Sequence, residues 1–155
     1  MKHVPSIRRR NAVTGTAGMK LLALAAVCVV AAGCGGGNRL SKREFLKQGN
    51  AICAKGTRKI DRLGLTAFKT PGHPTPAETV AFAKTVAVPI TQSELDQLRA
   101  LKRPKGDENS VKTLLDKAQA AVDRVRAHPT LLGQANGSDE ANALARAYGL
   151  TACAG

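Results

Sequence analysis

Residues 41–63, SKREFLKQGNAICAKGTRKIDRL, decide the fold of this chain. The segment opens with a capping box, in which the Ser41 hydroxyl accepts from the Glu44 amide and the Glu44 side chain returns to the Ser41 amide. Apolar and small residues then recur at spacings of three and four, the period of one helical face. They are Phe45, Gly49, Ile52, Gly56, Ile60 and Leu63. The segment therefore predicts an amphipathic helix.

Gly49 and Gly56 lie on the apolar face of this helix. A glycine inside a helix costs about 1 kcal/mol relative to alanine. Because a residue without a side chain allows close packing, we expect a neighbouring helix to approach both positions.

The same signals predict helices over 75–101, 107–128 and 138–149, and no segment is typical of a strand. A second capping box begins at Thr75, and Pro89 should kink or split its helix near Val86 because proline lacks an amide hydrogen. Asp107 is a candidate cap for the next helix, and Gly149 is a candidate C-terminal cap for the last. We therefore expect an all-α fold, a small antiparallel bundle of about four helices.

An export signal is predicted before this domain. Lys20 precedes the apolar residues 21–32, LLALAAVCVVAA, which are followed by Gly33 and Cys34. A positive flank, a short apolar core and a small-residue cleavage site are typical of a secretory signal peptide. The apolar run is shorter than the roughly 20 residues that a membrane span needs. An ordinary signal peptide with an incidental cysteine is the alternative, and translation from Met19 would also leave a compact signal.

The sequence Ala32-Gly33-Cys34 resembles the lipobox of bacterial lipoproteins. The resemblance implies that Cys34 carries a thioether-linked diacylglycerol and becomes the first residue of the mature protein. Residues 1–33 are then the signal peptide, residues 34–40 the lipidated cysteine and a Gly-rich tether, and residues 41–155 the helical domain. We expect a lipid-anchored protein on the extracytoplasmic face of the cell membrane.

Two cysteines, Cys53 and Cys153, remain once Cys28 is removed with the signal and Cys34 is lipidated. Outside the cytoplasm a remaining pair usually forms a disulfide. Such a bridge would close a loop of about 100 residues, and in the chain-entropy model it stabilises the fold by up to about 4.7 kcal/mol. The alternative is a pair of buried thiols.

Three segments of the domain also carry a resemblance. They are Phe45 with Ala51-Ile52-Cys53-Ala54, Leu98-Arg99-Ala100-Leu101 before Pro104, and the closing Gly149-Leu150-Thr151-Ala152-Cys153-Ala154. In these features the chain resembles a group of uncharacterised small secreted lipoproteins of high-GC Gram-positive (actinobacterial) bacteria. The resemblance implies export, helices and the disulfide, and it implies no activity.

Positive charge is concentrated in the first helix of the domain. Removal of residues 1–33 lowers the net charge from +13 to +8, since that segment carries five cations and no acid. A lipid anchor and a polybasic segment together hold proteins on anionic surfaces. We expect contact with anionic headgroups, or alternatively a merely solvated helix face, at Lys42, Arg43, Lys47, Lys55, Arg58, Lys59 and Arg62.

No catalytic, metal-binding or cofactor motif is present, and we expect no enzyme, metal or cofactor. His128 suits a helix C-terminus, and acids such as Glu94 and Asp96 are interpreted as caps or solvated faces. The chain has no tryptophan, and aromatic platforms are typical of single-stranded nucleic-acid sites, so no nucleic-acid partner is expected.

Two functions follow from these observations. The first is a non-catalytic binding or structural role at the cell envelope, with headgroups or an envelope protein as partner. The alternative is a small-ligand or ion carrier with a cavity in the bundle, for which Gly49, Gly56 and Pro89 could leave room. It requires a pocket of at least roughly 300 Å³ with convergent polar groups.

Overall fold

The computed structural model describes residues 39–70, 72–134 and 137–155, so the expected signal peptide and Cys34 lie outside the described residues. The elements include α1 (Lys42–Ala67), α2 (Pro76–Phe82), a π-helical segment (Ala83–Ala87), α3 (Val88–Ala100), α4 (Glu108–Ala127) and α5 (Asp139–Tyr148), with 3-10 turns at Pro129–Leu131 and Thr151–Cys153. No strand occurs in the described part of the chain. The predicted all-α fold is confirmed.

Helix α1 begins where the sequence predicted and ends later. The Ser41 hydroxyl accepts from the Glu44 amide at 3.1 Å, while the second bond of the box, from the Ser41 amide to the Glu44 carboxylate, is not among the contacts of the described residues. The helix continues past Leu63 to Ala67, because the residues after Gly64 tolerate helical geometry until Phe68 turns extended.

The second capping box forms completely. The Thr75 hydroxyl accepts from the Glu78 amide at 3.2 Å, and the Glu78 carboxylate accepts from the Thr75 amide at 2.8 Å. Three groups donate hydrogen bonds to the Glu78 carboxylate: the Thr75 amide, the Lys69 amide and the Thr75 hydroxyl. Together they lower the pKa of Glu78 to about 2. The capping box therefore defines the start of α2.

Pro89 explains the π-helical segment between α2 and α3. A proline cannot donate to the carbonyl four residues earlier, here that of Thr85, and its ring would clash with that carbonyl. The helix instead adopts a wider π-helical turn, in which the Val88 amide donates to the carbonyl five residues earlier, that of Ala83. The irregularity predicted near Val86 is thus a π-helical segment, and the helical path continues through it without a split.

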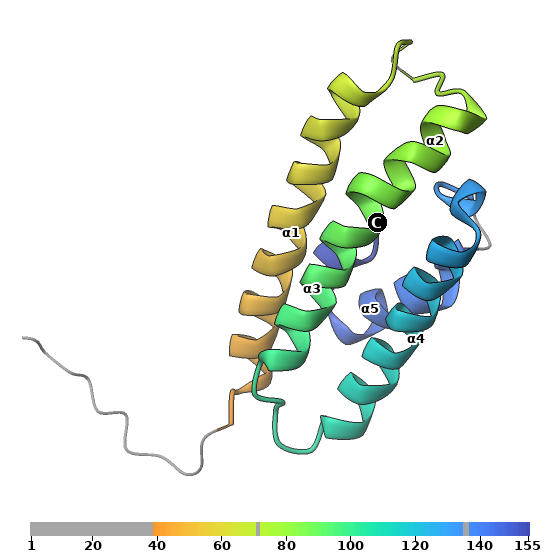
Figure 1. Ribbon diagram of the computed structural model, residues 1–155. Helices are drawn as coiled ribbons and strands as arrows, with labels where there is room; N and C mark the ends of the chain where they lie inside the picture. Colours follow the sequence, from red (N-terminus) through yellow and green to blue (C-terminus); the bar gives the residue numbers. More distant parts are fainter. Residues whose placement is uncertain (1–38, 71, 135–136) are drawn as a thin grey trace, which may run out of the picture. The chain divides into compact units, whose positions relative to one another are not determined.

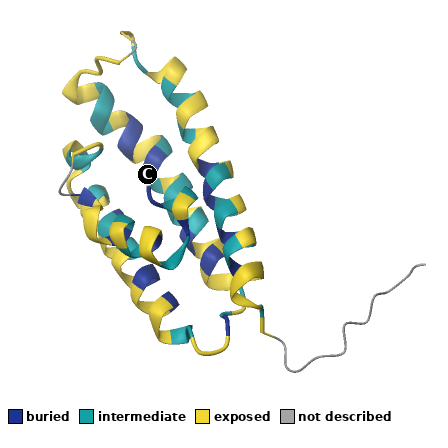
Figure 2. Ribbon diagram, turned by 180° about the vertical axis from the view of Figure 1, so that it is seen from behind, coloured by how far each residue is buried: buried dark blue, intermediate teal, exposed yellow. Residues whose placement is uncertain are grey.

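The helices pack as an antiparallel bundle. Helix α3 contacts α1 and α4, and α5 packs against α4 (Figure 1). Figure 2 shows buried residues on the facing sides of the helices and exposed residues on the outer sides. Phe45, Val111, Leu115 and Leu150 are almost completely buried in the core, where the Phe45 ring meets the Tyr148 ring edge to face. Each of the helices therefore buries one apolar face, as the spacing predicted.

The C-terminal residues turn back onto α1. Gly149 ends α5 in the left-handed conformation (φ 103°), which allows the Leu150 amide to reach the Ala145 carbonyl at 2.8 Å. Leu150 then packs over Gly49, where an added Cβ would lie 2.6 Å from a Leu150 methyl and 3.3 Å from a Leu98 methyl. The close approach predicted at Gly49 is confirmed.

Two links hold this tail to α1. The Asn50 side chain donates to the Gly149 carbonyl at 3.0 Å and accepts from the Ala152 amide at 2.8 Å. One turn further along, Cys53 forms a disulfide with Cys153, and their Cα atoms are 5.0 Å apart. The cysteine pair expected from the sequence is therefore joined in the structure.

Candidate functional site

A half-open cavity of about 450 Å³ lies between the helices of the bundle. Its walls come from α1, the π-helical segment, α3, α4, residues 131–134 and 137–138, α5 and the C-terminal residues, and they are mostly aliphatic. Ile60, Leu95, Leu98, Leu114 and Val122 are representative. The volume lies within the range of small-molecule sites, about 300–1,000 Å³.

Glu94, on α3, lines this apolar cavity, and its carboxyl group packs against Gly56 of α1. Its Oε1 atom is buried and has no hydrogen-bond partner among the described residues. The expectation that this acid lies on a solvated face was wrong, because the side chain turns toward α1. Gly56 makes the room, since an added Cβ would collide with the Glu94 carboxyl. The close approach predicted at Gly56 is therefore made by a carboxyl group.

Burial raises the pKa of Glu94 from its ordinary value of 4.5 to about 7. An apolar surrounding disfavours the ionised form of a carboxyl group. No lysine, arginine or histidine lines the cavity within the described part of the chain, so no cation of the wall offsets this effect. The group therefore gains or loses its proton near neutral pH.

The other polar side chains of the cavity differ in exposure. Thr91 and Asn142 are half-buried, while the exposed ones are Thr57, Gln134, Ser138 and Asp139. The described residues contain no group of three or more His, Cys, Asp or Glu side chains placed to hold a metal ion. The arrangement of aliphatic walls, a few polar groups and one buried acid is suited to binding an amphipathic molecule.

The disulfide forms part of the cavity wall. Both Cys53 and Cys153 line the cavity, together with Ala152 and Gly155 of the tail. The bridge and the Asn50 hydrogen bonds therefore fix the tail in a position where it closes one side of the cavity. The cysteine pair is evident in the sequence, whereas its place in the cavity wall follows only from the packing of the tail against α1.

The basic residues of α1 lie on its outer side. Successive residues of an α-helix are rotated by about 100° around its axis. On this basis six of the basic residues lie within an arc of about 160°, on the side of α1 away from the buried Phe45 and Cys53. All six are exposed and make no ion pair with the described part of the chain; they are Arg43, Lys47, Lys55, Arg58, Lys59 and Arg62. The structure thus brings six of the seven predicted contact residues onto one face.

Lys42, the seventh predicted contact residue, is placed differently. Its Nζ lies 3.4 Å from the Asp107 carboxylate and 4.5 Å from the centre of the Tyr148 ring. Asp107 makes no side-chain cap to α4, contrary to expectation, because its carboxylate accepts from the Tyr148 hydroxyl at 3.0 Å. Burial and this bond raise the pKa of Tyr148. Lys42 and Asp107 therefore join α1 to the ends of α4 and α5.

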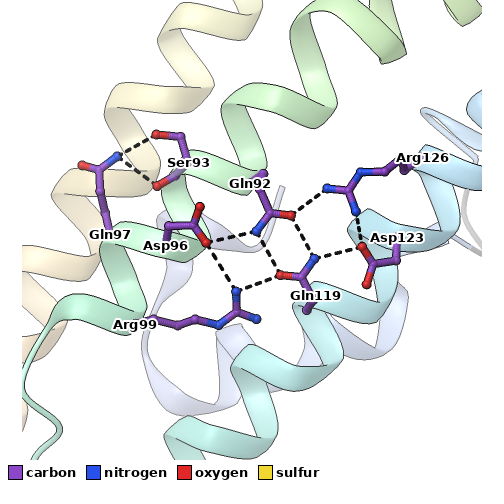
Figure 3. A network of polar contacts seen from close by, with 8 residues as sticks. All are labelled: Gln92, Ser93, Asp96, Gln97, Arg99, Gln119, Asp123 and Arg126. Atoms are coloured by element: carbon purple, nitrogen blue, oxygen red, sulfur yellow. Dashed lines mark hydrogen bonds and ion pairs between the residues drawn. The ribbon is translucent and has the colours of Figure 1, made fainter.

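A polar cluster between α3 and α4 was not predicted (Figure 3). Gln92 and Gln119 exchange two hydrogen bonds between their side-chain amides, at 3.0 and 2.9 Å. Arg126 donates to the Gln92 oxygen at 2.7 Å, and Arg99 donates to the Gln119 oxygen at 2.8 Å. Each arginine also pairs with the acid three residues before it, Asp123 or Asp96. We name these six residues the glutamine clamp.

The glutamine clamp has a sequence signature. Residues 92–99, QSELDQLR, and 119–126, QAAVDRVR, share the pattern Q-x-x-x-D-x-x-R. Because spacings of four and three place side chains on one helical face, two antiparallel copies can meet as equivalent halves. The same segments supply equivalent apolar residues to the cavity, Leu95 and Leu98 from one copy and Val122 and Val125 from the other. The clamp therefore fixes two of the cavity walls.

Among the described residues, no helix is both long and apolar enough to cross a bilayer. In comparisons with protein-family models, curated proteins and solved structures, nothing matches this chain. The site is therefore interpreted from its own geometry.

Proposed function

We propose that this chain is a lipid-anchored extracytoplasmic protein that binds a small, largely apolar molecule inside its helical bundle. The observation that carries the proposal is the cavity of about 450 Å³, walled by aliphatic residues from every long helix. A concave, mostly aliphatic surface with a few polar groups is typical of small-molecule sites. Binding of such a molecule accounts for the cavity.

The binding role is tested by filling the cavity. Ala121 lines the cavity on α4, whereas Ala120, its neighbour in the chain, is exposed. We expect Ala121→Leu in the full chain to weaken binding of the neutral fluorescent probe N-phenylnaphthylamine at least tenfold, while Ala120→Leu leaves it unchanged. Equal binding by both variants would show that the probe does not occupy the cavity and would refute the binding role.

The proposed anchor is supported by the lipobox resemblance at Ala32-Gly33-Cys34. Cys34→Ser should release the protein from the membrane fraction, and the mass of the wild-type protein should equal that of residues 34–155 plus lipid. Cys28→Ser is the matched control, since Cys28 belongs to the same apolar segment, and it should leave the anchor intact. Retention of the Cys34→Ser variant would refute lipid attachment at this residue.

The basic face of α1 supports a second contact, with anionic lipid headgroups. Six exposed cations without ion pairs among the described residues form this face, and each cation near an anionic membrane contributes about 1 kcal/mol or less. Replacing Lys55 and Lys59 with Glu should weaken binding to vesicles containing phosphatidylglycerol at low salt. Replacing Lys84 and Lys105 with Glu makes the same change in net charge elsewhere. An equal loss in both variants would indicate a nonspecific effect of net charge.

A further inference from the structure

We infer that the ligand of the cavity is a cationic amphiphile, an apolar body with one protonated amine that pairs with the Glu94 carboxylate. This inference rests on the proposed binding role and specifies its ligand class. It depends on three properties of the site: an unpartnered carboxyl oxygen, a wall without cations, and a volume suited to an apolar body.

The unpartnered oxygen requires a donor. Glu94 Oε1 is buried and accepts no hydrogen bond from the described residues. A buried acceptor left without a donor destabilises the fold, and more so when it is charged. Glu94 also lines the cavity, so a ligand there can supply a donor to this carboxyl group.

The position of the carboxyl group is built into two helices. Glu94 extends from α3 toward α1, and Gly56 on α1 leaves the space that the carboxyl occupies. An alanine at position 56 has a higher helix propensity but would displace this carboxyl group. The glycine thus keeps an acid between α3 and α1 at the expense of helix stability.

The charge of the wall selects a cation. The described wall contains no lysine, arginine or histidine, and its second acid, Asp139, is exposed at the start of α5. An anionic ligand would meet only negative charge, while a neutral alcohol would leave the carboxylate charge unbalanced in an apolar surrounding. A protonated amine both donates a hydrogen bond and balances the charge.

The pairing also sets a pH dependence. The pKa of Glu94 in the empty cavity is raised to about 7, whereas an alkyl amine stays protonated well above neutral pH. A bound ammonium group favours the ionised carboxyl, so binding must expel the Glu94 proton at low pH. Amine affinity should therefore increase between pH 5.5 and pH 8, and affinity for a neutral analogue should not.

The test compares octylamine, octanol and octanoate in calorimetric titrations of the full chain. These molecules share one apolar body and differ in the charge of one end. Because a hydrogen bond to a charged group contributes about 1.5–3 kcal/mol, octylamine should bind about tenfold to a hundredfold more tightly than octanol, and octanoate most weakly. Glu94→Gln should remove the advantage of the amine over octanol, with Asp61→Asn, an exposed acid of α1, as control.

A second variant tests the same contact without altering the acid. Gly56→Ala should displace the carboxyl group and lower octylamine affinity, whereas Gly64→Ala, where an added Cβ would lie 3.7 Å from the nearest atom, should not. Equal affinity for octylamine and octanol, or full retention of the amine preference in Glu94→Gln, would overturn the inference. If N-phenylnaphthylamine binds and octylamine does not, the ligand class is wrong and the binding role stands; if neither binds, the binding role itself fails.

Discussion

Replacing Glu94 with Gln should change how the stability of the fold depends on pH. The pKa of Glu94 is raised from 4.5 to about 7 in the folded chain, so the folded state binds this proton more tightly than the unfolded state. Below pH 4.5 the group is protonated in both states, and its proton adds no pH dependence to the stability. As the pH rises from about 4.5 through 7, the folded state must lose this proton in an apolar surrounding, and the wild-type protein loses stability.

The magnitude follows from the shift and from the exposure of the side chain. A full shift from 4.5 to about 7 corresponds to roughly 3 kcal/mol. The Glu94 side chain is only partly buried, and screening by water reduces this figure. We expect a loss of about 1–2 kcal/mol in the wild-type protein between pH 4 and pH 8 from this group, and none from glutamine, which does not titrate.

Urea unfolding with the disulfide intact measures this difference. The free energy of unfolding of Glu94→Gln minus that of the wild type should increase by about 1–2 kcal/mol from pH 4 to pH 8. Asp61→Asn controls for the loss of an acid at an exposed position of α1. A difference between Glu94→Gln and the wild type that stays constant with pH would refute the conclusion that this carboxyl is buried without a partner.

Three further predictions concern the attachment of the tail to α1. Gly49→Ala should destabilise the fold by about 1–3 kcal/mol in urea unfolding, because the new Cβ would lie 2.6 Å from a Leu150 methyl. Unchanged stability would mean that Leu150 can move aside. Asn50→Ala should cost about 1–3 kcal/mol and accelerate hydrogen exchange at the Ala152 amide, which now donates to Asn50; unchanged exchange would contradict that bond. Cys153→Ser should lower stability by about 2–5 kcal/mol, and thiol labelling of the unreduced native protein should not modify this cysteine; labelling in the native state would contradict the bridge.

The fold was largely predictable because its signals are local. Capping residues at Ser41 and Thr75, a proline at 89 and a glycine at 149 act within one or two turns of their own position. Thr75 forms its complete capping box, Ser41 caps α1 through one of the two expected bonds, Pro89 follows a π-helical segment, and Gly149 ends α5. The extension of α1 to Ala67 was missed, because a glycine at position 64 weakens a helix without necessarily ending it.

The candidate site was less predictable because it depends on which side chains meet across helices. Gly56 indicated a close approach, but the sequence does not show that the approaching group is the Glu94 carboxyl. Acids on helices are usually solvated, and only the position of α1 relative to α3 places this one inside. The glutamine clamp is a different case, since its repeated Q-x-x-x-D-x-x-R pattern is visible in the sequence and could have been found by a search for internal repeats.

The disulfide has a consequence for the fate of the chain after proteolysis. The Cys53–Cys153 bridge joins residues one hundred positions apart, and the exposed segments 72–77 and 133–134 lie between them. A single cut in either segment gives two peptides that remain covalently joined through sulfur. The amino-terminal peptide contains residue 34 and the other contains α5, so an attachment at residue 34 would also retain the carboxyl-terminal peptide. Release of that peptide would require a reductant in addition to a protease.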